Sequence, residues 1–548
     1  MTPCARTALL AFPLLSAFLP FGRAIEAGPR PAGNGPPPLW FYHSTNLWVD
    51  KQVDALDALM RRAARAGYSR LLLADSKFHK LGDMDARYFR NIDRIKALAA
   101  ELRIEVIPAL FPIGYSEGLL WHDPNLAEAL PVRDALFVVQ GGEARIAADP
   151  PVALRGGDFK NRRDWGFVDE TVIFEDGTAR VTDPKGRNAR CSQKVGVRPF
   201  RQYHISVTVK TQDFQGEPKI VVLAGDRSLN HAALGVKPTQ DWTEHHAVFN
   251  SLEAEEVGIY LGCWEGTTGT LAWKHARLEE VGLLNLVRRD GAPLAVKTET
   301  GSLLAEGTDF ERVIDPRMGT QPYRGCYDVW HEPPILRTRL PDGTRLRVSY
   351  HHAVTVHDGQ VMICPSEPRT VELLRDEAQR IHAAWGARGY FMSHDEIRVL
   401  GWDAACARRN LSTGAILADN ARTCAAILRE VNPGGAIYVW SDMFDPHHNA
   451  HANYYLVKGD LAGSWEGLDR DIHIAAWYYE RREKSLPFFA GRGHPILLAG
   501  YYDAPPERVT GWLDAAKTSG GAAGVLYTTW RNNYTDLERF AEIVRTHR

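Results

Sequence analysis

Short apolar strands alternate with amphipathic helices along this chain, and a long interruption after the third strand breaks the alternation. The first three strands are expected at 39–43, 70–75 and 105–111. Between them, apolar residues recur at the spacing of one buried helix face. The pattern then stops for roughly 250 residues, far more than an ordinary connection between two elements. We therefore expect a second domain inserted after the third strand.

The alternation resumes with a helix near 371–385 and then supplies five more strands. Three strands before the interruption and five after it make eight, the count of a (β/α)8 barrel. The sequence thus predicts an α/β fold, a TIM barrel with a domain inserted after strand 3. A doubly wound open sheet is the structural alternative, although no G-x-G-x-x-G motif follows an early strand. The later strands are predicted at 389–394, 436–441, 471–477, 495–501 and 524–529.

The inserted region is rich in short strands of alternating polarity separated by turn residues, a pattern typical of a β-sandwich. Its Gly-Asp-Phe opening at 157–159, its strand at 203–210 and its closing strand at 269–273 resemble the jelly-roll carbohydrate-binding modules of polysaccharide-degrading enzymes. The resemblance implies sugar binding, but such folds also serve as structural spacers. The predicted organisation is barrel at 39–123, a β-rich connection at 124–153, the sandwich at 154–281, a second β-rich connection at 282–365, and barrel again at 366–548.

The amino terminus carries Arg6 and then an apolar run that ends near small residues, as in a secretory signal peptide. We expect a signal peptide at 1–24, a Pro/Gly-rich linker at 25–38, and a secreted or periplasmic protein. The run is short and interrupted by prolines, so no membrane span is predicted. Six cysteines follow residue 24 without a C-x-x-C pair, which leaves one or two disulfides open and predicts no zinc site.

The balance of charged residues and the absence of nucleotide motifs narrow the classes of ligand. A formal net charge of −2 provides no basic surface for nucleic acid. No Gly-rich phosphate loop or G-x-S-x-G motif is present, and no cofactor is predicted. His447, His448 and His451 have a spacing that could suit a metal, but without H-E-x-x-H they are expected to be loop residues or sugar contacts.

Acidic and aromatic residues gather where the predicted barrel strands end. The carboxyl ends of barrel strands carry the chemistry of this fold. The fourth strand ends on two adjacent carboxylates, Asp395 and Glu396, which we take as the candidate catalytic pair. Aromatic rings beside them could pack on the faces of pyranose rings. The candidate substrate-binding residues are His43, Asp75, His394, Trp440, Asp442, Trp477, Tyr502, Asp503, Tyr527 and Trp530.

An Asp-Glu pair after strand 4, with tryptophans that close strands 5, 6 and 8, resembles the β-N-acetylhexosaminidases of glycoside hydrolase family 20. The resemblance is confined to the two barrel parts. It implies that Asp395 supports the 2-acetamido group of the substrate while that group attacks the anomeric carbon, and that Glu396 protonates the leaving oxygen. The family carries a glutamate just after its last tryptophan, where this chain has Arg531.

Both acids of the pair can reach one sugar only if the chain leaves the strand there, because successive strand residues point to opposite faces. Charge coupling in the pair is expected to favour a protonated Glu396 beside an ionised Asp395.

Two functional classes stay open. One is a secreted glycoside hydrolase that acts on an oligosaccharide or polysaccharide, and the other is a non-catalytic glycan-binding protein on a barrel scaffold. Within the enzyme class, the alternative to a substrate-assisted mechanism is two-carboxylate hydrolysis, with Glu396 as acid and Asp442 or another rim acid as nucleophile or base.

Overall fold

The computed structural model describes residues 36–547 except 185, 265–267 and 358. The predicted signal peptide and most of the predicted linker lie outside the described residues. Within the described part of the chain, no helix is long and apolar enough to cross a membrane.

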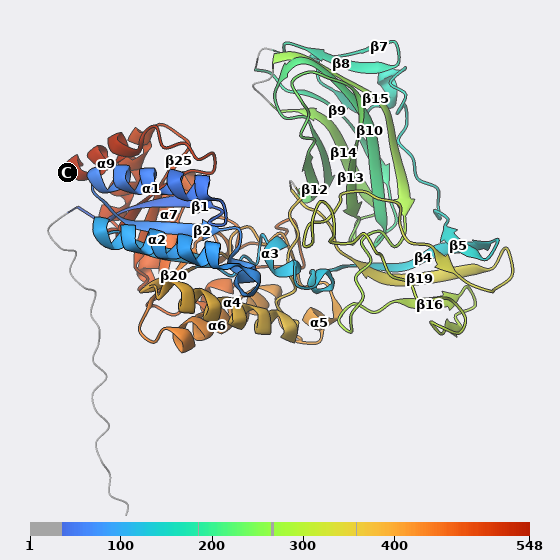
Figure 1. The fold of residues 1–548 in the computed structure, drawn as a ribbon. Coiled ribbons are helices and arrows are strands. Elements are labelled where there is room, and N and C mark those ends of the chain that lie inside the picture. The colour runs from blue at the N-terminus through green and yellow to red at the C-terminus, as the bar shows by residue number, and fades with distance from the viewer. Residues whose placement is uncertain (1–35, 185, 265–267, 358, 548) are drawn as a thin grey trace, which may run out of the picture.

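Eight parallel strands form a closed barrel, and the predicted fold class is confirmed. The strand order β1-β2-β3-β20-β22-β24-β25-β26 follows the chain, and helices cover the outside (Figure 1). The strands are β1 (Leu39–Thr45), β2 (Tyr68–Asp75), β3 (Glu105–Leu110), β20 (Gly389–Met392), β22 (Ala436–Trp440), β24 (His473–Ala476), β25 (Ile496–Tyr502) and β26 (Gly524–Thr528). The main helices are α1 (Asp50–Arg65), α2 (Ala86–Leu102), α4 (Pro368–Trp385), α6 (Thr413–Val431), α7 (Arg482–Gly491), α8 (Val509–Lys517) and α9 (Leu537–Thr546).

Side chains fill the barrel interior, so the barrel is a packed core rather than a pore. Trp40 on β1 contacts Tyr438 on β22, with ring centroids 4.9 Å apart. These strands are not neighbours in the barrel, so the contact crosses its axis. Phe391 on β20 and Leu526 on β26 belong to the same buried cluster. Residues two positions apart on one strand therefore share the interior face, and their neighbours face the helices.

The insert between β3 and β20 contains two five-stranded antiparallel sheets, in the orders β13-β10-β15-β8-β7 and β12-β11-β14-β9-β6. Together they form the β-sandwich, which lies to one side of the barrel in Figure 1. Its strands are β6 (Phe167–Val168), β7 (Val172–Glu175), β8 (Thr178–Thr182), β9 (Ala189–Gly196), β10 (Gln202–Gln215), β11 (Lys219–Ala224), β12 (Arg227–Ala233), β13 (Gln240–Asn250), β14 (Glu256–Cys263) and β15 (Thr268–Val281).

A third, six-stranded sheet lies at the foot of the sandwich, and its strands come from both flanks of the insert (Figure 1). We call it the linking sheet. The short helix α3 (Glu117–Leu120) lies between it and the barrel. The sheet has the order β17-β16-β19-β4-β5-β18, with β4 (Leu130–Gln140), β5 (Glu143–Ile146), β16 (Ala295–Thr298), β17 (Leu303–Leu304), β18 (Leu336–Arg337) and β19 (Arg345–His352).

A buried histidine joins the linking sheet to the sandwich. His352 on β19 is fully buried, and its Nε2 lies 3.0 Å from the amide nitrogen of Asn250 on β13. Its Nδ1 lies 3.0 Å from the amide nitrogen of Gln202 on β10 and 3.0 Å from the carbonyl oxygen of Ala353. Burial lowers the pKa of His352 to about 4, so the ring is neutral at pH 7.

We predict that His352→Leu destabilises the insert by about 1–3 kcal/mol, because a buried amide donor loses its acceptor while the volume is kept. Urea unfolding followed by tryptophan fluorescence measures the loss. His451→Leu, at an exposed loop histidine, is the control and should change little. The stabilisation that His352 gives the wild type should be complete above pH about 6.5 and should be lost as the pH falls towards about 4, because the histidine of the unfolded chain binds a proton at a higher pH than the buried one. Equal effects of the two substitutions would contradict the prediction.

Candidate active site

The alternation of side chains along the strands decides which predicted residues face the barrel axis. Trp440 on β22 and Trp477 after β24 continue the interior faces of their strands. On β25, a register shift between Ala499 and Tyr501 breaks the alternation. Tyr501 consequently packs outward with the helices, and Tyr502 is left on the inner side. Asp395 lies four residues beyond the interior Phe391 and so has the same parity.

Glu396 would face the other way in a regular strand, but its backbone has φ 51°. This left-handed conformation is uncommon for a residue other than glycine, and it redirects the side chain. Strand β20 has already ended at Met392. The chain has therefore left the strand at the pair, which is the condition for both acids to reach one sugar. Burial raises the pKa values of Tyr502 and Tyr115, two residues that lie on other parts of the barrel rim, and the charges of both acids raise them further.

The backbone of the acid pair is fixed from the loop after β3. A Cβ atom on Gly114 would lie 1.9 Å from the carbonyl oxygen of Asp395, so only glycine fits there. Gln360, from the segment that returns from the insert, donates from Nε2 to the carbonyl oxygens of Gly114 (2.6 Å) and Glu396 (2.9 Å). Gln360 is almost fully buried. The pair is thus held by two segments that lie far from it in the sequence.

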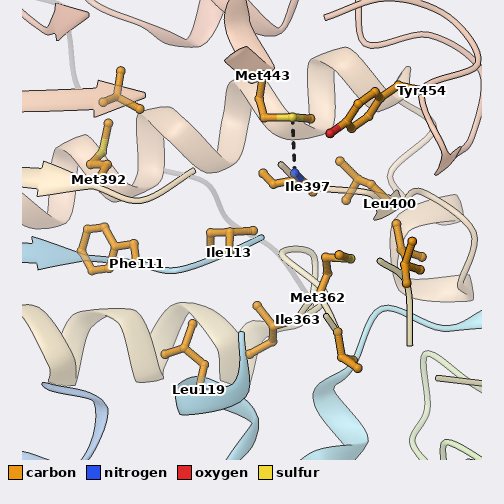
Figure 2. Packing of buried hydrophobic residues seen from close by; sticks show 14 of the residues in the cluster. Phe111, Ile113, Leu119, Met362, Ile363, Met392, Ile397, Leu400, Met443 and Tyr454 are labelled. Atoms are coloured by element: carbon orange, nitrogen blue, oxygen red, sulfur yellow. Dashed lines mark hydrogen bonds between the residues drawn. The ribbon is translucent and has the colours of Figure 1, made fainter. Parts of the chain in front are cut away.

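Apolar packing holds the residues that follow the pair. Figure 2 shows Ile397 and Leu400 among side chains from the loop after β3, the returning segment and the turn after β22. The backbone nitrogen of Ile397 lies 3.3 Å from the sulfur of Met443. Ile113 and Met362 belong to the same cluster. A loop anchored on both sides of the acid pair positions its carboxyl groups more firmly than a free loop would.

The side chain of Glu396 is held by a cation and a phenol. Its Oε1 lies 2.8 Å from Nη2 of Arg398, which is almost fully buried, and Tyr115 donates a hydrogen bond to its Oε2. Arg398 also donates a hydrogen bond to Oε1 of Gln360. Its guanidinium carbon lies 5.0 Å from the ring centroid of Tyr455. The side chain of Glu396 remains 24% exposed, so this carboxyl group is oriented and still accessible.

Asp442 is a third acid of the site, and it begins η4 (Asp442–Phe444) directly after β22. Its Oδ2 accepts from the backbone nitrogen of Glu396 (2.8 Å) and from Nδ2 of Asn449 (3.0 Å), and its Oδ1 accepts from Nε1 of Trp477 (3.2 Å). The side chain is fully buried. With both oxygens engaged, Asp442 is placed to support Glu396 and Trp477 rather than to attack a sugar.

Burial raises the pKa of Asp395, and the neighbouring charges of Asp442 and Glu396 raise it further. Burial also raises the pKa of Asp442. In contrast, Glu396 forms an ion pair with the guanidinium of Arg398. A raised pKa favours the protonated form of Asp395, whereas charge coupling alone is expected to leave Asp395 ionised. The contacts that Arg398, Tyr115 and buried Asp442 make with the pair depend on the fold and cannot be read from local sequence.

Aromatic rings form a wall beside the acids. The ring centroids of Trp477 and Tyr502 lie 5.8 Å apart at an interplanar angle of 8°. The ring centroid of Trp530 lies 6.2, 6.0 and 5.0 Å from the ring centroids of Tyr502, Trp440 and Tyr42. Tyr502 and Trp530 are each 45% exposed, so the wall presents ring surface to a ligand. Aromatic faces next to carboxyl groups suit the binding of a pyranose ring.

Four predicted site residues lie outside this arrangement, on the side of the strands that faces the helices. Asp75 accepts hydrogen bonds from Tyr88 and from the backbone, and Tyr527 donates to the carbonyl oxygen of Asn533. His43 binds the hydroxyl of Tyr534 at 2.7 Å, and fully buried His394 binds Asn420 at 3.0 Å. Alternation explains all four, because Tyr42, Leu72, Phe391 and Leu526 hold the interior positions of their strands.

Asp503 supports the wall from behind rather than joining the acids. Its oxygens accept from the hydroxyl of Thr529 (2.6 Å) and the backbone nitrogen of Trp530 (2.9 Å). The sequence patterns did not indicate five further residues of the site, Tyr42, Tyr115, Gln360, Arg398 and Asn449. Alternation from Trp40 would have indicated Tyr42. The other four lie on loops or on the insert's return, where no periodicity guides a prediction.

No protein-family model and no curated protein match the chain. Among solved structures it is similar to a β-N-acetylhexosaminidase (11% identity, 95% of this chain and 72% of that chain, TM-score 0.38) and to a chitobiase from Flavobacterium johnsoniae (10%, 93% and 51%, TM-score 0.36). A structure described as CBM4 matches 23% of this chain and 84% of its own at 21% identity, with a TM-score of 0.18. Similarities at this level of identity and TM-score do not establish an activity for this chain. The barrel is assigned from its own closed strand order.

Proposed function

We propose that the protein is a glycoside hydrolase, exported as its amino-terminal apolar run indicates, that cleaves a glycan bound against the aromatic wall. The observation that carries the proposal is the acid pair, Asp395 and Glu396, turned toward one site by the left-handed backbone at Glu396. A protein that only binds glycans needs the aromatic wall but has no need of two adjacent acids fixed by Gly114 and Gln360.

Two assignments of the pair account for hydrolysis. In the substrate-assisted mechanism, suggested by the family 20 resemblance, Glu396 protonates the leaving oxygen, and Asp395 supports the acetamido group of an N-acetylhexosamine. In the exchanged assignment, Asp395 donates the proton and Glu396 acts as the carboxylate. The raised pKa of Asp395 and the Arg398 and Tyr115 contacts of Glu396 favour the exchanged roles. Asp442 as nucleophile is disfavoured by its burial and its three hydrogen bonds.

We predict that Asp395→Asn and Glu396→Gln respond differently to the leaving group. The variant that lacks the proton donor should lose about 10²–10⁴-fold on aryl glycosides with poor leaving groups and far less on activated ones. The variant that lacks the anionic partner should lose activity on both. Steady-state kinetics on N-acetylated and non-acetylated aryl glycosides measure this, and Glu483→Gln, an exposed carboxyl group on α7, is the control. Wild-type rates in both site variants would contradict the proposed function.

The pH profile of kcat/KM gives an independent answer. If Asp395 is the proton donor, activity should fall as the pH rises through its raised pKa, because the proton is then lost. If Asp395 acts as the anion, activity should instead fall as the pH drops below that pKa. Asp395→Asn should remove the corresponding limb, and an unchanged profile in that variant would show that Asp395 does not titrate in catalysis.

We also predict that Gly114→Ala lowers kcat/KM by about 10²-fold or more, because the new Cβ displaces the Asp395 carbonyl and with it the acid pair. Gly491→Ala is the matched control, since nothing lies within 4 Å of the added atom. Both proteins should give the circular dichroism spectrum of the wild type. Full activity of Gly114→Ala would show that the pair is not held from this loop.

A further inference from the structure

Four buried metal-binding side chains meet where the insert joins the barrel. Two of them, Glu128 and Cys364, lie on the segments that leave and re-enter the barrel, which pair through a bridge between Ala127 and Ile363. The other two, Asp403 and Cys406, cap and form α5 (Ala404–Ala407), in the loop that follows the acid pair. One donor atom from each of the four lies within 4.8 Å of all the others.

The spacing of the donors fits a tetrahedral ion. The sulfurs of Cys364 and Cys406 are 3.7 Å apart, and the sulfur of Cys406 is 3.4 Å from Oε2 of Glu128. On a tetrahedral zinc, with bonds of about 2.3 Å to sulfur and about 2.0 Å to oxygen, two sulfurs lie about 3.8 Å apart, and a sulfur and an oxygen about 3.5 Å. Two thiols in simple contact would share the sulfur spacing, but they would not account for the two carboxylates turned toward them.

Neighbouring groups hold the two carboxylates as outer-shell partners hold metal ligands. The backbone nitrogens of Gly401 and Trp402 donate to Oε1 of Glu128 at 2.9 and 3.0 Å, which leaves Oε2 for the cluster. Arg289 donates to Oδ2 of Asp403 at 2.7 Å and also faces Glu367. Arg289 thus pairs with buried Asp403 and half-buried Glu367, and a divalent cation would offset the negative charge that remains at Glu128.

We propose that Glu128, Cys364, Asp403 and Cys406 form a structural Zn²⁺ site that fastens both ends of the insert to the loop carrying the acid pair. All four positions of the tetrahedron come from the protein, so the site is closed and not catalytic. The proposal does not depend on the hydrolase activity. It replaces the sequence expectation of no zinc site, which relied on the absence of C-x-x-C, because Glu128 and Cys406 are 278 positions apart.

The test is the metal content of the full-length protein, purified without chelator and dialysed against metal-free buffer. Elemental analysis should find about one zinc per chain. The double variant Cys364→Ala/Cys406→Ala should retain less than about a tenth of it. Cys424→Ala, at a buried cysteine of α6 outside the cluster, is the matched control and should keep the metal. Replacement of zinc by Co²⁺ should give a thiolate charge-transfer band in the wild type that the double variant lacks.

The wild type alone can overturn the proposal, whether or not the double variant folds. Zinc well below one per chain, with Cys364 and Cys406 found either joined as a disulfide by mass spectrometry or both free to a thiol reagent, would show that the cluster is not a metal site. Removal of bound zinc by a strong chelator should lower Tm, because an ion bound only by the folded state stabilises it, and added Zn²⁺ should restore the original value.

Discussion

The left-handed backbone at Glu396 is the constraint on which the rest of the site depends. A non-glycine residue with positive φ costs of the order of 1 kcal/mol or more, and it persists only where the surroundings hold it. Here Asp442 accepts from the backbone nitrogen of Glu396, and Gln360 donates to its carbonyl oxygen. Because both polar groups of this residue are engaged, two adjacent acids can serve one side of a strand end.

The groups that hold Glu396 in place come from segments that lie far apart in the sequence. Asp442 follows strand β22, and Gln360 comes from the segment that returns from the insert. The sandwich itself touches the barrel, since Arg227 on β12 donates to the carbonyl oxygens of Tyr455 and Val457. Tyr455 in turn lies under the guanidinium of Arg398, the ion-pair partner of Glu396. The insert is thus in contact with the groups that position the candidate catalytic carboxyl.

Elements with strong periodicity were predictable from the sequence, and contacts between distant loops were not. Eight strands, their parallel barrel and the insertion after the third strand follow from apolar patterns that local residues determine. Strand ends also indicated Asp395, Glu396, Trp440, Trp477 and Trp530. His43, Asp75, His394 and Tyr527 were selected by counting strand ends, and the alternation of side chains along the strands places them on the side that faces the helices. Tyr115, Gln360 and Arg398 escaped prediction because their roles depend on which loops meet in three dimensions.

Gly114 and Gln360 bear on how a barrel of this kind can change by recombination. A carbohydrate-binding domain attached at a chain end can be lost or exchanged without disturbing the enzyme beside it. Here Gly114, on the segment that leads into the insert, packs against the backbone of Asp395. Gln360, on the segment that returns from it, donates a hydrogen bond to the backbone of Glu396. A deletion that closed the barrel directly after β3 would remove both Gly114 and Gln360, and with them two of the contacts that hold the acid pair. The barrel and the insert are therefore expected to be inherited as one unit, and sequence exchange by recombination is expected only at the end of the sandwich that is remote from the barrel.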